Sequence, residues 1–107
     1  MSISDDQCSA YFTKESRMLW SRRFVKEWLA DPQMQFISGH SLNSLTTLAN
    51  MWIQRTAIRS DQRYPIVSSR DIKEAALEVL GSEEISRHEH QVADHLEAII
   101  RNDRVRC

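Results

Sequence analysis

The chain has 107 residues, a hydrophobic content of 41% and a formal net charge of −1. This length predicts one domain, close to the smallest size that buries its own core. The near-neutral charge gives no overall basic footprint for nucleic acid, and no apolar run is long enough to span a membrane. The first ten residues carry Asp5 and Asp6 without an apolar core, so they do not resemble a secretory signal. We expect an intracellular protein, nuclear or cytoplasmic.

Residues 1–12 are expected to form a flexible arm, 13–103 a single helical domain and 104–107 a C-terminal tail. Cys8 and Cys107 lie near opposite ends of the chain. We expect two free thiols, with a disulfide between the termini as the alternative in an oxidising compartment.

The first predicted helix begins at a cap, Thr13, and continues to Ala30, where Asp31-Pro32 ends it. Its broad apolar stripe consists of Met18, Leu19, Trp20, Phe24, Val25, Trp28 and Leu29. Large aromatic residues anchor cores and also protein interfaces, so docking on a partner is an alternative to burial. Residues 13–30 also hold five basic residues against two glutamates, a balance of +3. This pattern is typical of a solvated face and also suits phosphates or an acidic partner.

A second, longer helix is predicted from Ser38 or Ser41 to about Asp61. Its apolar positions recur at spacings of three and four: Leu42, Leu45, Leu48, Ala49, Trp52, Ile53 and Thr56. The opposite face is polar and largely uncharged: Asn43, Thr46, Thr47, Asn50, Gln54 and Arg55. We expect this polar face to be exposed, with partial covering as the alternative.

The stretch 65–81 predicts a short extended segment that leads into a capped third helix. Pro65 keeps the chain out of a helix, and Ile66-Val67 is a β-branched pair suited to a brief strand-like contact. Ser68 and Asp71 have the spacing of a capping box, and Gly81 ends the helix. The apolar positions between them are Ile72, Ala75, Ala76, Val79 and Leu80.

A fourth helix is predicted from Ser82, with two glutamates in its first turn, to about Asn102. Its apolar positions are Ile85, Val92, Leu96, Ile99 and Ile100. The helix also carries His88, His90 and His95. His88 and His95 are two turns apart, about 10 Å along the axis, so they cannot share one metal ion directly. We interpret the histidines as a solvated or partly packed face and predict no metal site and no cofactor.

The predicted order is helix, long helix, short extended loop, helix, helix. This order defines an all-α domain, either histone-fold-like or a small helical bundle. The sequence contains no serine elbow, no glycine-rich phosphate loop and no cysteine close to a histidine. We therefore predict no enzymatic activity and no small-molecule substrate.

The run from Ile66 to Ile72, with Ser-Arg-acid-Ile at its end, is similar to the second loop and third-helix start of the H-two-B class of core histones. Glu84–His88 is similar to the segment that opens the C-terminal helix of that family. Further similar positions lie in the central helix: Ile37-Ser38 at its start, then Ala49-Asn50, Arg55 and Ala57. The resemblance covers roughly residues 14–100. It implies a short, a long and a short helix joined by two loops, and pairing of two such chains.

The loop and helix after Pro65 also resemble the small helical lid of AAA+ ATPases, which is the competing resemblance. The histone resemblance implies that Arg63 and the segment 68–70 face phosphates, since hydroxyls at a helix N-terminus suit an anion; simple capping is the alternative. The candidate nucleic-acid-binding residues are Arg22, Arg23, Lys26, Arg63, Ser68, Ser69 and Arg70. The candidate partner-binding residues are Trp20, Phe24, Trp28, Trp52 and Ile53.

Two functional hypotheses follow from the sequence. The first is a histone-fold-like subunit that dimerises with itself or another protein and supports a DNA-associated assembly. Its dimer would bury Trp52, Ile53, Ile72 and Val79. The second is a small helical adaptor or inhibitor that docks its aromatic first helix on a protein target without contacting nucleic acid.

Overall fold

The computed structural model describes residues 13–31, 33–34, 41–82 and 90–106. Within these ranges the protein forms four helices and no strand: α2 (Lys14–Ala30), α4 (Leu42–Ser60), α5 (Ser69–Leu80) and α6 (His90–Arg106). The predicted all-α class is therefore confirmed. The arm predicted for residues 1–12 lies outside the described residues.

Three helices begin where the sequence predicts, because each start carries its own cap. Thr13 and Ser41 each accept a hydrogen bond from the backbone N–H three residues later. Ser68 forms a reciprocal capping box with Asp71: each side chain accepts the other residue's backbone N–H, at 3.3 Å and 3.0 Å. These side chains satisfy amides that a helix otherwise leaves unpaired in its first turn.

The C-terminal ends of the helices agree less well with the ends predicted from the sequence. α4 ends at Asp61, which adopts a left-handed conformation with φ of 58°. α6 continues to Arg106, beyond the predicted end at Asn102, so residues 104–106 are helical. The predicted start of this helix, with Glu83, Glu84 and Ile85, lies outside the described residues.

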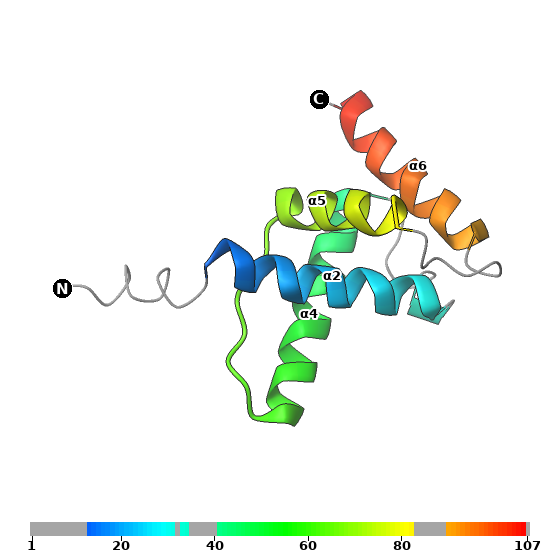
Figure 1. Ribbon diagram of the computed structural model, residues 1–107. Helices are drawn as coiled ribbons and strands as arrows, with labels where there is room; N and C mark the ends of the chain where they lie inside the picture. Colours follow the sequence, from blue (N-terminus) through cyan, green and yellow to red (C-terminus); the bar gives the residue numbers. More distant parts are fainter. Residues whose placement is uncertain (1–12, 32, 35–40, 83–89, 107) are drawn as a thin grey trace.

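The four helices form two layers. α2 and α5 lie side by side and run in the same direction, and α4 crosses behind them, with its C-terminal half extending past α2 (Figure 1). α6 packs against α4 and α5. The core lies where the apolar faces of these helices meet.

The core contains most of the predicted apolar stripes. Each helix contributes at least four buried apolar residues, led by Phe24 and Trp28 on α2, Leu45 and Ile53 on α4, Ile72 on α5 and Leu96 on α6. Leu19 is an exception, since it is 54% exposed and does not belong to the buried stripe of α2. The contact between α2 and α5 is close because α5 presents small residues there, Ala75 and Ala76, both fully buried.

The extended segment 62–68 returns along α4, where the side chain of Asn50 pairs with its backbone. The Asn50 amide donates to the Val67 carbonyl at 2.9 Å and accepts from the Val67 N–H at 2.9 Å. This pairing satisfies both backbone groups of Val67, as a neighbouring strand would. Ser69 also contacts α4, accepting from the Thr46 hydroxyl and donating to Asn43, both at 3.2 Å.

This segment explains the uncharged polar face of α4. Thr46 and Asn50 are half-buried beneath it, whereas Thr47, Gln54 and Arg55 are exposed. The predicted exposure therefore fails for the residues that the segment covers. Amide and hydroxyl groups suit this position because they can pair with an extended backbone without carrying a charge into a partly buried site.

Ser21 provides a stability prediction in this core. Its side chain is fully buried in α2, and its hydroxyl has no hydrogen-bond partner among the described residues. A buried hydroxyl without a partner costs about 1–3 kcal/mol relative to water. We expect Ser21→Ala to raise the free energy of unfolding by about 1 kcal/mol, measured by urea denaturation. Ser16→Ala, on an only partly buried position of the same helix, is the control, and equal effects of both changes would contradict this account.

Among the described helices, none combines the length and the hydropathy that crossing a bilayer requires.

Candidate interaction surfaces

The basic face of α2 is paired with acidic residues of α5. Three ion pairs join the two helices: Lys14–Glu74 at 3.4 Å, Arg17–Asp71 at 3.3 Å and Arg22–Glu78 at 2.9 Å. The acids lie three and four residues apart, so they share one face of α5 and meet α2 together. The acidic partner suggested by the charge balance of the first helix is thus a helix of the same chain.

This pairing affects the basic candidates for nucleic-acid binding on α2. Arg22 donates to Glu78, and the Arg23 guanidinium lies 4.5 Å from the centre of the Trp20 ring, in a cation–π contact. Lys26 is exposed. Arg22 and Arg23 are therefore engaged within the chain.

The hydroxyls at the N-terminus of α5 are engaged as well. Ser68 caps the helix, and Ser69 is hydrogen-bonded to Thr46 and Asn43. The carboxylate of Asp71 accepts the Ser68 N–H and also pairs with Arg17, so it occupies the position that a phosphate would take. The geometry of Ser68 is therefore that of simple helix capping, the alternative to an anion contact. Arg63 and Arg70 are exposed.

Four of the five candidate partner-binding residues lie in the core of this chain, and the fifth, Trp52, packs against it. Phe24, Trp28 and Ile53 are fully buried, and Trp20 is 5% exposed. Trp52 is half-buried, with its ring centre 6.3 Å from that of Trp20 and 5.9 Å from that of Phe24. They are buried because α2 crosses α4 at this level, so one helix covers the aromatic face of the other.

This burial corrects the position of the predicted interfaces. Trp20 and Phe24 are held against Trp52 of α4, and Trp28 against His95 of α6, so these rings are not open to a partner in this structure. The same applies to Ile72 and Val79, which are buried within this chain on α5. The aromatic residues of the first helix are thus buried within this chain.

The histidines form no metal site among the residues that the structure describes, where no group of three metal-ligating side chains occurs. His95 is half-buried, and its ring stacks on Trp28 with centres 5.9 Å apart and planes 12° apart. His90 is exposed, and His88 lies outside the described residues. His95 therefore helps to hold α6 against α2.

A different surface extends along the whole of α4, on the side away from the core. We define the outer face of α4 as Ser44, Thr47, Met51, Gln54, Arg55 and Ile58, all of which are exposed. They recur at spacings of three and four, so they share one side of the helix. Met51 is 51% exposed and Ile58 is 63% exposed. Thr47, Gln54 and Arg55 belong to the polar face predicted from the sequence, whereas Met51 and Ile58 were not predicted, because two apolar residues among polar ones do not form an amphipathic stripe.

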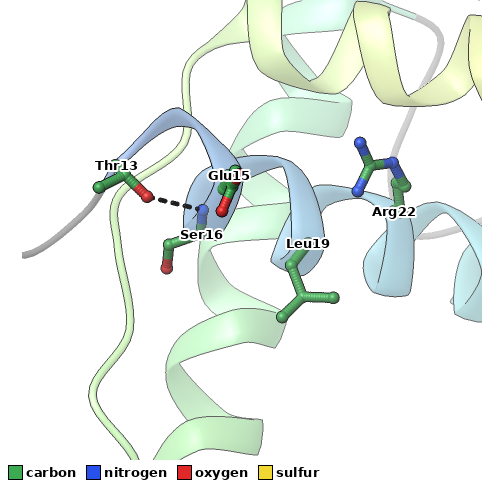
Figure 2. Close-up of a pocket in the computed structure, with 5 residues that line it drawn as sticks. All are labelled: Thr13, Glu15, Ser16, Leu19 and Arg22. Carbon is green, nitrogen blue, oxygen red and sulfur yellow. Dashed lines mark hydrogen bonds between the residues drawn. The ribbon is translucent and has the colours of Figure 1, made fainter.

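Leu19 lies at a shallow hollow on the outer side of α2. Figure 2 shows its lining, which consists of Thr13, Glu15, Ser16, Leu19 and Arg22. Two of its polar side chains are already engaged, since Thr13 caps the backbone of Ser16 and Arg22 pairs with Glu78. All of its residues come from the first turns of one helix, so it provides no enclosed site.

Comparisons with protein-family models, with curated proteins and with solved structures found no match for this chain.

Proposed function

We propose that this protein is a non-enzymatic interaction module, a histone-fold-like subunit that pairs with a second helical chain through the outer face of α4. The observation that carries the proposal is the uneven covering of α4. α2, α5 and the segment 62–68 cover its other sides, while the outer face is exposed from Ser44 to Ile58. The order of helices supports the same proposal, since the histone resemblance implies a central helix that pairs, although α4 has 19 residues against 17 in α2 and is not distinctly the longer of the two.

The proposal is limited to pairing between proteins. Of the seven candidate residues for nucleic-acid binding, Arg22, Arg23, Ser68 and Ser69 are engaged inside the chain. A contact with DNA would have to be provided mainly by the assembly, because few basic groups give a weak and salt-sensitive contact.

Pairing of the chain with itself should be weak. Full burial of one large apolar side chain contributes about 1.5–3 kcal/mol, and Met51 and Ile58 are each only about half exposed. Association costs at least about 4 kcal/mol in lost freedom of motion. Self-association should therefore appear only at high protein concentration. Self-association should also need a salt concentration high enough to screen the repulsion between the basic side chains of two copies.

We expect light scattering at about 1 M salt, where the Debye length is about 3 Å, to give an average mass that rises with protein concentration. Met51→Glu combined with Ile58→Glu should return the mass to that of the monomer, because it places charges in the apolar contact. The measurement is the weight-average mass over a concentration series for each protein.

Leu19→Glu combined with Leu77→Glu is the matched control, since both leucines are about half exposed and lie on α2 and α5. This variant should behave like the unchanged protein. A monomer at every salt concentration would show that the outer face of α4 does not pair with its own copy, and an equal loss of mass in both double variants would show that self-association does not use this face.

A further inference from the structure

We propose that the outer face of α4 selects a partner helix that carries acidic side chains beside its apolar stripe, and that this helix belongs to a different protein. This inference rests on the proposed function and adds the chemistry of the partner. It follows from the charges on α4, from the way in which this chain already pairs two of its helices, and from the symmetry of self-pairing.

α4 carries a basic edge and no acidic residue. Its 19 residues include Arg55 and Arg59 but neither aspartate nor glutamate. Both arginines are exposed and lie four residues apart, so they project from the same side of the helix, next to Ile58. Neither forms an ion pair with another described residue. A partner that covers Met51 and Ile58 would therefore also meet two positive charges.

The packing of α2 on α5 shows which side chains pair with a row of basic residues in this protein. Along α5, Asp71, Glu74 and Glu78 recur at spacings of three and four beside a buried apolar stripe. Each of them meets a basic residue of α2. A partner helix with the same pattern, acids one turn apart next to apolar residues, would satisfy Arg55 and Arg59 in the same way.

A second copy of this chain does not offer that pattern. In a twofold pair built on the outer face, Met51 of one copy meets Ile58 of the other, because the contact is self-complementary. The twofold axis then passes between Gln54 and Arg55, so Arg55 of one copy lies opposite Arg55 of the other. Contact between like charges disfavours the pairing of two copies and so helps to exclude the wrong partner. The suitably spaced acids on α5 of the second copy are already paired with its own α2, and Glu97 on α6 is paired with Arg101.

Two synthetic helical peptides of the same length as α4 test this inference. Both carry leucine at spacings of three and four; one has glutamate on the flanks of the leucine stripe and the other has lysine at the same positions. At about 0.1 M salt, where the Debye length is about 10 Å, fluorescence anisotropy should show at least about tenfold tighter binding of the glutamate peptide. Raising the salt concentration should weaken this binding, which is opposite to the salt effect expected for self-association.

Arg55→Glu combined with Arg59→Glu should reverse the preference, and the milder Arg55→Gln combined with Arg59→Gln should remove it. Arg70→Glu combined with Arg101→Glu, which makes the same change of charge on α5 and α6, should leave it intact. Circular dichroism checks that each variant keeps its helices. Equal binding of both peptides, or an unchanged preference in the Arg55 and Arg59 variants, would overturn the inference.

The two proposals fail in different ways. If neither peptide binds while the mass still rises at high salt, the outer face pairs with its own copy and the preference for an acidic partner is wrong. If neither peptide binds and the protein stays monomeric at every salt concentration, the proposed function fails as well.

Discussion

Trp28→Ala should be among the most destabilising single changes in this protein, lowering the free energy of unfolding by about 3–5 kcal/mol. Trp28 is fully buried on α2 and stacks on His95 of α6, so alanine would leave a large cavity and remove a contact between two helices. A loss of this size is a large part of the roughly 5–15 kcal/mol that stabilises a typical domain. Urea denaturation followed by circular dichroism measures it.

Leu19→Ala is the matched control for this prediction, because Leu19 is an apolar residue of the same helix and is 54% exposed. We expect it to change the free energy of unfolding by less than about 0.5 kcal/mol. If the two substitutions had similar effects, Trp28 would not be a core residue, and the aromatic first helix could dock on a partner after all.

Asn50→Ala should have the second largest effect among the changes considered, a loss of about 2–3 kcal/mol. The Asn50 side chain provides the two hydrogen bonds that satisfy the N–H and the carbonyl of Val67. Each buried backbone group left without a partner costs about 1 kcal/mol or more. The loss should be accompanied by faster hydrogen exchange at the Val67 amide, measured by NMR.

Two other polar residues of α4 provide the comparison for Asn50. Thr47 is exposed, and its hydroxyl donates only to the carbonyl of Asn43 in the same helix. Asn43 is exposed too, and it accepts a hydrogen bond from Ser69. Thr47→Ala and Asn43→Ala should each cost less than about 1 kcal/mol and leave the exchange of the Val67 amide slow. If Asn50→Ala were equally mild, the segment 62–68 would be held by other contacts.

The local features of this fold could be predicted from the sequence. Thr13, Ser68 and Asp71 cap their helices through bonds to residues three positions away, so a short window of sequence contains the whole interaction. The apolar spacing in α4 likewise marks Leu45, Ala49 and Ile53 as one buried face.

Contacts between helices could not be predicted in this way. The basic residues of α2 and the acids of α5 were visible in the sequence, but nothing local indicates that these two helices lie side by side. The same holds for Asn50 and Val67, which are 17 residues apart. An aromatic stripe is also compatible with a core and with an interface, so only the crossing of α2 over α4 shows that Trp20, Phe24 and Trp28 point inward.

The methyl resonances of the methionines test most directly whether the outer face of α4 is the pairing surface. Met51 lies on that face and is 51% exposed, whereas Met18 is buried in the core and Met34 is half-buried. In protein labelled with ¹³C at the methionine methyl groups, we expect the Met51 resonance to shift with protein concentration at about 1 M salt, where charge repulsion is screened. It should shift again when the glutamate peptide is added, while the Met18 and Met34 resonances stay in place. A rise in mass, or binding of the peptide, without any change at Met51 would place the contact elsewhere and contradict the proposed function.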